Sequence, residues 1–114
     1  MTIDEKIKQI SDYYGFDAQS RQCIEEMAEL TQAINKFWRK QLLYGFVTLN
    51  ELKAEETETS KLSDEKEFQN LVEEMADVQV CLWHLAYLLN TDYTEVCERK
   101  LDREIERIKE RGED

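Results

Sequence analysis

Two stretches of the chain carry the same arrangement of carboxylates. Residues 23–30 read CIEEMAEL and residues 71–78 read LVEEMADV, so each has an acidic pair followed three residues later by another acidic side chain. On a helix, residues three apart are neighbours, with Cβ atoms about 5–6 Å apart. If both stretches are helical, each presents two adjacent carboxylates to one side. The predicted pairs are Glu26 with Glu29, and Glu74 with Asp77.

Both carboxylate pairs continue stripes that become apolar one turn later. Four residues beyond Glu26 stands Leu30, and four beyond Glu74 stands Val78, with no lysine or arginine at three or four residues to neutralise either acid. Carboxylates that are partly buried without a cation cost free energy or take up protons. A divalent cation removes this cost, and Mg²⁺ prefers six oxygen ligands at about 2.0–2.1 Å. We therefore predict that two facing helices form a Mg²⁺ site, with Mn²⁺ as a substitute.

A single ExxE pattern is weak support for such a site, because glutamate-rich helices usually expose their acids to solvent. Two matched patterns, both in phase with apolar stripes, favour a functional cluster over a solvated face.

The elements that carry these residues are predicted to be helices, so the fold class is all-α. The chain has no proline and only three glycines, whereas sheet proteins need turn residues at short intervals. A single domain over residues 1–114 suits this length. The predicted helices cover about 3–14, 18–43, 63–89 and 92–111, with an irregular connection at about 44–62 that includes a short helical piece near 50–58.

The third of these helices predicts an assembly. From Val78 to Leu89 only Gln79 and His84 are strongly polar, so the helix is apolar around nearly its whole circumference. A chain this small covers such a helix poorly. We therefore expect a central helix in a four- to five-helix bundle that a second copy completes, as a homodimer or homotetramer.

Both acidic motifs resemble a known signature. Glu25 to Glu29 (EEMAE) and Glu74 to Asp77 (EMAD) resemble the EExxE…ExxD signature of the MazG-like all-α nucleoside triphosphate pyrophosphohydrolases. The flanking EEMAELTQAINK at 25–36, EEMADVQVCL at 73–82 and a closing helix with Lys100 and Arg103 agree with it. The resemblance extends over about residues 13–108.

This resemblance implies Mg²⁺-dependent cleavage of a nucleoside triphosphate between the α and β phosphates, giving a monophosphate and pyrophosphate. It implies that Glu26, Glu29, Glu74 and Asp77 are the metal ligands. Glu25 or Glu73 would then complete the shell or orient the attacking water.

Four further side chains are candidates for substrate binding. Lys100 and Arg103 share a face of the last helix, where they would either clamp phosphate or pair with neighbouring acids. Lys36 and Trp38 follow the first motif by about two turns, and Trp38 would either stack on a base or pack in the core.

Composition excludes several other classes. A net charge of −11 argues against a nucleic-acid partner, which needs a basic face. The chain has no basic-then-apolar leader and no apolar stretch long enough for a membrane span, so we expect no membrane partner.

Three cysteines without a CxxC pair favour a reducing cytoplasm. A di-iron bundle lacks its Glu-x-x-His motifs, which leaves a non-enzymatic acidic helical interaction or regulatory protein as the alternative.

Overall fold

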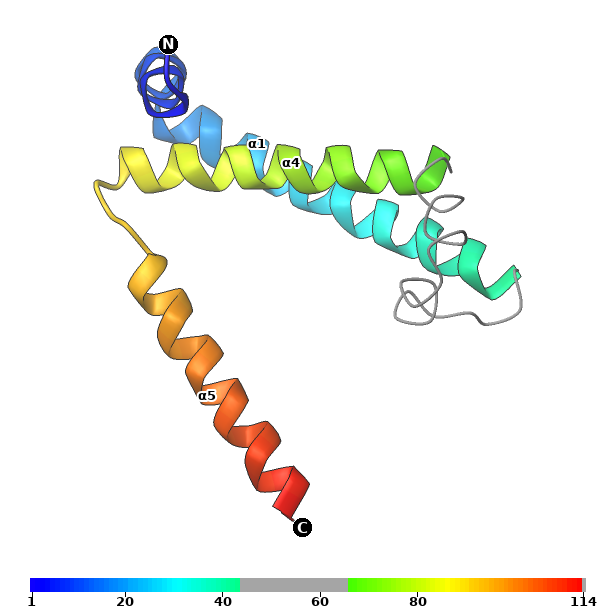
Figure 1. The fold of residues 1–114 in the computed structure, drawn as a ribbon. Coiled ribbons are helices and arrows are strands. Elements are labelled where there is room, and N and C mark those ends of the chain that lie inside the picture. Colours follow the sequence, from blue (N-terminus) through cyan, green and yellow to red (C-terminus); the bar gives the residue numbers. More distant parts are fainter. Residues whose placement is uncertain (44–65, 114) are drawn as a thin grey trace.

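The structure is a computed structural model that describes residues 1–43 and 66–113. Within these ranges it contains helix α1 (Ile3–Leu43), helix α4 (Lys66–Leu88) and helix α5 (Thr94–Glu113), and no strand (Figure 1). The predicted all-α class is therefore confirmed for the described residues. The irregular connection predicted at about 44–62, with its short helical piece near 50–58, lies outside them.

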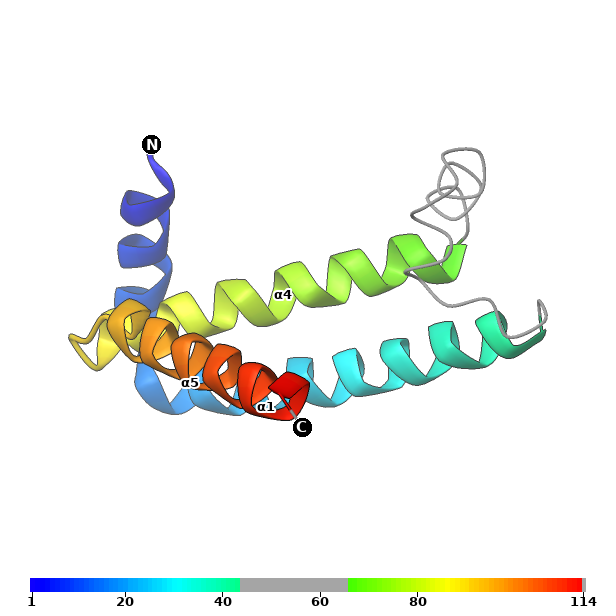
Figure 2. The same ribbon diagram turned by 60° about the horizontal axis from the view of Figure 1, so that its bottom comes forward.

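Helix α1 changes direction at Gly15, between the two helices predicted there. Gly15 has φ 81° and ψ 172°, while the residues on both sides are helical. The predicted break is confirmed, but a single residue makes it and no loop separates the two parts. Residues 3–14, the N-terminal segment, therefore turn away from the long arm of α1, residues 16–43 (Figure 2).

We expect Gly15→Ala to lower the free energy of unfolding by about 1–3 kcal/mol, because this backbone region is essentially restricted to glycine. No heavy atom lies within 4 Å of an added Cβ, so the cost comes from the backbone alone. Urea denaturation measures it. Gly112→Ala also meets no atom within 4 Å and should not destabilise the protein. Equal stability of Gly15→Ala and the unaltered protein would contradict the strained turn.

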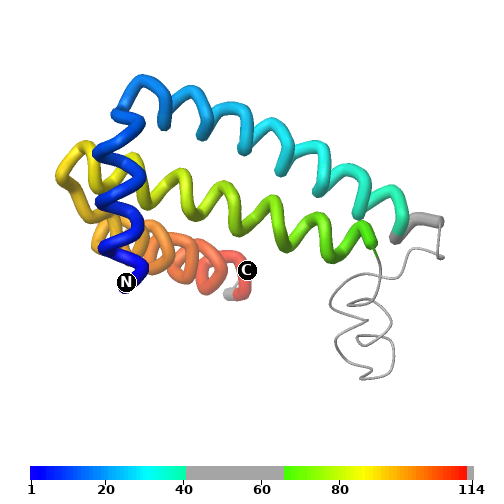
Figure 3. Tube along the Cα trace, turned by 90° about the horizontal axis from the view of Figure 1, so that it is seen from above, coloured from blue at the N-terminus to red at the C-terminus, as the bar shows by residue number. Residues whose placement is uncertain are grey.

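The long arm of α1 and helix α4 lie side by side and antiparallel (Figure 3). The rings of Phe37 and Phe68 are 6.0 Å apart, and Lys40 Nζ lies 3.3 Å from a carboxylate oxygen of Glu67. The C-terminal half of α1 therefore faces the N-terminal half of α4. This register brings the two acidic motifs to the same level of the pair.

The N-terminal segment crosses α4 near its C-terminal end. Ser11 Oγ and His84 Nδ1 share a hydrogen bond of 2.6 Å, and both residues are buried. On the surface beside them, the Tyr87 hydroxyl donates to Asp12 Oδ1 at 2.9 Å and Lys8 Nζ donates to Tyr87 at 3.1 Å. These contacts hold the segment against the helix pair.

The buried His84 predicts a pH-dependent stability. Burial lowers the pKa of His84 below its ordinary value of about 6.5, against the opposing effect of a hydrogen bond to the Ile7 backbone. The unfolded chain thus binds a proton at a higher pH than the folded chain, and stability is lost as the pH falls below about 6.5. On acidification through this range, the melting temperature of the unaltered protein should fall relative to that of His84→Gln. A constant difference between the two proteins would contradict the assignment.

Helix α5 begins at a cap that follows the end of α4. Asn90 has φ 50°, which ends α4, and Asp92 Oδ1 accepts hydrogen bonds from the Thr94 N–H and hydroxyl at 3.0 and 2.7 Å. In the described part of the chain, α5 packs against neither α1 nor α4. Its apolar stripe is accordingly exposed, with Leu101 64% accessible. The four- to five-helix bundle therefore stays a prediction.

No helix within residues 1–43 and 66–113 has the length and apolar character that crossing a bilayer requires.

Candidate metal centre

Three of the four predicted metal ligands meet between α1 and α4. Glu26 and Glu29 of α1 and Glu74 of α4 each offer a carboxylate oxygen, and these three oxygens lie within 4.8 Å of one another. Glu26 and Glu74 are half-buried, and Glu29 is exposed. We call these three residues the acidic cluster. Separate helices supply it, as the two motifs predict.

Small buried side chains bring the two helices together at this level. Cys23 lies one turn before Glu26, Cys81 lies two turns after Glu74, and both are nearly inaccessible to solvent, as is Ala33. Small residues at a helix contact allow a short distance between the axes. Carboxylates from opposite helices can therefore reach a common point.

Glu26 is oriented by its own helix. Gln22 Nε2, one turn earlier, donates to Glu26 Oε1 at 2.7 Å. The other oxygen, Glu26 Oε2, is buried and has no hydrogen-bond partner, and the same is true of Glu74 Oε2. Buried acceptors without a partner cost free energy, more so when they are charged.

The electrostatics of the acidic cluster favour a cation. In the part of the chain that the structure describes, no lysine or arginine forms an ion pair with its members. Burial raises the pKa of Glu74 above its ordinary value, and the charges of Glu29, Asp77 and Glu26 raise it further. A divalent cation would satisfy the unpartnered oxygens and remove the repulsion. The donors are all carboxylate oxygens, which suit Mg²⁺ or Mn²⁺.

Neither Cys23 nor Cys81 belongs to the group of potential metal ligands within the described residues. Burial, followed by the neighbouring Cys23 and the charge of Glu26, raises the pKa of Cys81 to about 11. Because the thiolate is the form that binds metals and attacks electrophiles, this shift disfavours Cys81 in either role at neutral pH. The arrangement therefore favours coordination by oxygen.

The remaining acidic candidates lie at the edge of the cluster. Asp77 is exposed and outside the three-carboxylate group, but it is close enough for its charge to raise the pKa of Glu74. Glu25 and Glu73 are exposed and are also outside the group.

The predicted substrate-binding residues fall into two separate places. Lys36 and Trp38 line one pocket on α1, and Lys36 also lines a pocket between α1 and α4. Trp38 is 54% accessible and thus outside the core. Lys100 and Arg103 lie exposed on α5, and the structure does not bring them to the acidic cluster.

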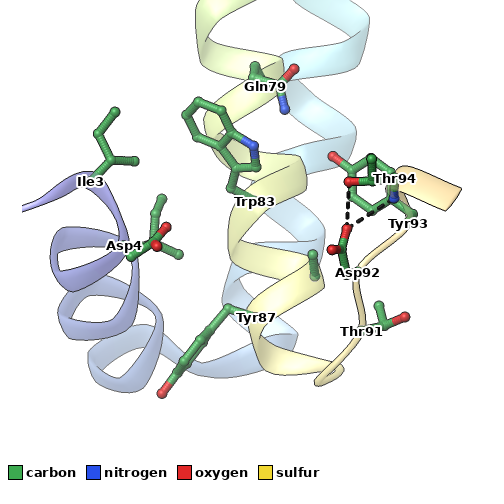
Figure 4. Close-up of a pocket in the computed structure, with 11 residues that line it drawn as sticks. Ile3, Asp4, Gln79, Trp83, Tyr87, Thr91, Asp92, Tyr93 and Thr94 are labelled. Carbon is green, nitrogen blue, oxygen red and sulfur yellow. Dashed lines mark hydrogen bonds between the residues drawn. The ribbon is translucent and has the colours of Figure 1, made fainter.

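A different pocket, of about 600 Å³, lies between the N-terminal segment, α4 and the start of α5 (Figure 4). Trp83 and Tyr87 of α4 face Ile3 and Asp4 across it. Gln79, which also lines it, is five residues from Glu74, a spacing that places the two on different sides of a helix. The pocket is therefore separate from the acidic cluster.

The motifs did not predict two of the side-chain hydrogen bonds described above. Gln22 lies four residues before Glu26, a spacing at which helical side chains meet, so the sequence contained a signal for its hydrogen bond. The pairing of Ser11 with His84 had no such signal, because 73 residues separate them.

No family model, curated protein or solved structure matches this chain. The MazG-like family assignment accordingly stays a prediction from the motifs.

Proposed function

We propose that this protein is a Mg²⁺-dependent nucleoside triphosphate pyrophosphohydrolase, a MazG-like enzyme that cleaves its substrate between the α and β phosphates. One observation carries the proposal. Carboxylates from two helices, Glu26, Glu29 and Glu74, converge at a point where two buried oxygens have no partner. The same three residues belong to the EExxE and ExxD motifs.

Each carboxylate has a distinct part in this proposal. Glu26, Glu29 and Glu74 would hold the cation, and Asp77 would join them from the exposed edge. When bound, the cation supplies positive charge that polarises phosphorus and offsets the charge of the phosphate chain. Glu25 and Glu73 flank the cluster and are candidates for orienting the attacking water and accepting its proton.

Hydrolysis in this scheme adds one water across the anhydride between the α and β phosphates. The bond between them breaks, the nucleoside monophosphate and pyrophosphate leave, and one proton is released. Water is the nucleophile in this scheme, so it needs no covalent intermediate, and the raised pKa of Cys81 agrees with this.

The charge of the protein favours a substrate that arrives with its cation. A chain of net charge −11 repels a free triphosphate, most strongly beside three clustered carboxylates. A divalent cation shared by the carboxylates and the phosphates reverses that repulsion.

A panel of ribo-, deoxyribo- and modified triphosphates, assayed with and without Mg²⁺, tests the proposal. At least one substrate should yield equal amounts of monophosphate and pyrophosphate, and chelation of Mg²⁺ should stop the reaction. Release of orthophosphate instead of pyrophosphate would contradict cleavage between the α and β phosphates.

The exposed apolar stripe of α5 bears on the second candidate, a non-enzymatic helical interaction or regulatory protein. Leu101, Ile105 and Ile108 are each more than half accessible, and a partner would cover them.

For the enzyme, we propose that this partner is a second copy of the chain, in a homodimer or homotetramer. We also propose that the free cysteines reflect a cytoplasmic location. An interaction protein would show no stabilisation by Mg²⁺.

A further inference from the structure

A second pocket bridges α1 and α4 beyond the acidic cluster. Its volume is about 300 Å³, and Lys36, Lys66, Glu67 and Asn70 line it. Lys36 belongs to α1 and the other three to α4, so the pocket lies between the two helices that build the cluster. We call it the lysine pocket.

The lysine pocket lies on the same side of the helix pair as the acidic cluster. Lys36 follows Glu29 by seven residues and Asn70 precedes Glu74 by four, and both spacings return to nearly the same face of a helix. Because the helices are antiparallel, both steps lead in the same direction along the pair. Seven residues correspond to about 10 Å of helix. The lysine pocket and the cluster therefore lie about two helical turns apart on one face of the helix pair.

The lysine pocket is cationic, in contrast to the cluster. Among the described residues that line it, the acid is Glu67, and a carboxylate oxygen of Glu67 lies 3.3 Å from Lys40 Nζ. A hydrogen bond from the Glu67 backbone, and then the one from Lys40, lower the pKa of Glu67 and keep it ionised. Within the described ranges, Lys36 and Lys66 form no hydrogen bond or ion pair. Two positive charges and the amide of Asn70 are therefore available to an anion.

The face of the helix pair is different on the other side of the cluster. There α1 carries Gln22, whose amide donates to Glu26, and α4 carries the exposed Asp77. Beyond them Gln19 and His84 are buried, and His84 is bound to Ser11. Lys36 and Lys66 therefore place positive charge on one side of the acidic cluster, and these residues place none on the other.

We propose that Lys36 and Lys66 bind the β and γ phosphates, the half of the substrate that leaves as pyrophosphate. This inference rests on the proposed function and adds an orientation to it. The α phosphate lies at the acidic cluster, and the nucleoside lies toward Gln22, on the side away from the lysine pocket. Lysine binds phosphate as a point charge, and the amide of Asn70 would donate a further hydrogen bond.

Calorimetric titration of inorganic pyrophosphate into the full chain, with Mg²⁺ present, tests this orientation. The double variant Lys36→Gln/Lys66→Gln should bind pyrophosphate at least about tenfold more weakly than the unaltered protein. Both lysines are exposed, so circular dichroism should show an unchanged fold. Lys6→Gln, which removes one exposed lysine from the N-terminal segment, is the charge control and should bind pyrophosphate normally.

Two further titrations show whether the lysines recognise pyrophosphate specifically or any phosphate. The affinity for a nucleoside monophosphate should change less than about twofold in the double variant, because that half of the substrate does not reach the lysine pocket. Orthophosphate should bind more weakly than pyrophosphate to the unaltered protein, since it engages fewer donors.

The failures of the two proposals are distinguishable. Unaltered affinity for pyrophosphate in the double variant, no measurable affinity in the unaltered protein, or an equal loss for the monophosphate would overturn the lysine assignment, even if hydrolysis is fast. A protein that binds pyrophosphate through these lysines but releases none from any triphosphate would refute the hydrolase proposal instead.

Discussion

Glu74→Gln is expected to reduce Mg²⁺-dependent pyrophosphate release by about a thousandfold or more, because it removes a ligand that α4 supplies to the cluster. Its helical circular-dichroism signal should be unchanged. In the absence of metal, the variant should also melt at a higher temperature than the unaltered protein. Glu74 Oε2 is buried without a partner, and burial and neighbouring charges raise the pKa of the carboxyl. A neutral amide removes that repulsion.

Glu98→Gln is the matched control, because it makes the same change on the exposed surface of α5. It should leave turnover and the melting temperature almost unaltered. Full turnover by Glu74→Gln would show that the acidic cluster is not the catalytic centre, and lower stability without metal would contradict the electrostatic strain.

Mg²⁺ is expected to stabilise the protein strongly. At a concentration about one hundred times Kd, a ligand that binds only the folded state adds about 2.7 kcal/mol. For a domain of this size, this corresponds to a rise in melting temperature of about 10 °C. Differential scanning fluorimetry over a range of Mg²⁺ concentrations measures it.

The same stabilisation should depend on pH. Because the pKa of Glu74 is raised, the folded protein without metal holds this proton to a higher pH than the unfolded chain, and the ionisation of Glu74 lowers stability as the pH rises above about 4.5. Between about pH 4.5 and 6.5 this contribution opposes that of His84. Metal binding requires the ionised form, so protons compete with Mg²⁺. The rise in melting temperature should be larger near pH 8 than near pH 5.

Potassium chloride at equal ionic strength is the control, because it screens repulsion without binding specifically. A rise that potassium chloride reproduces would show that screening, and not coordination, relieves the acidic cluster.

The acidic cluster could be predicted from sequence because each of its parts is local. The spacing of Glu26 and Glu29 places them on one helix face, and the apolar residues that follow turn that face toward a neighbouring helix. The matching pattern at Glu74 identifies the neighbour. What the pattern left open was how far each acid turns inward, and the structure includes Glu74 in the three-carboxylate group but leaves Asp77 at its edge.

The parts that could not be predicted depend on distant contacts or on a single torsion. Gly15 indicated a break between two helices. The direction of the N-terminal segment, however, follows from the φ of 81° at Gly15 and from the contact between Ser11 and His84. The lysine pocket could not be predicted because it depends on how α1 and α4 are aligned along each other. Lys66 also lies outside both acidic motifs, so nothing in the sequence pattern marked it. The position of α5 has no local determinant, because its apolar stripe fits any apolar surface.

Titration with Mn²⁺ followed by electron paramagnetic resonance tests whether Glu26, Glu29 and Glu74 hold one divalent cation. We predict saturable binding to the unaltered chain, competition by Mg²⁺, and loss of this binding in Glu74→Gln but not in Glu98→Gln. Equal Mn²⁺ binding by all three proteins, or no saturable binding by the unaltered chain, would contradict it.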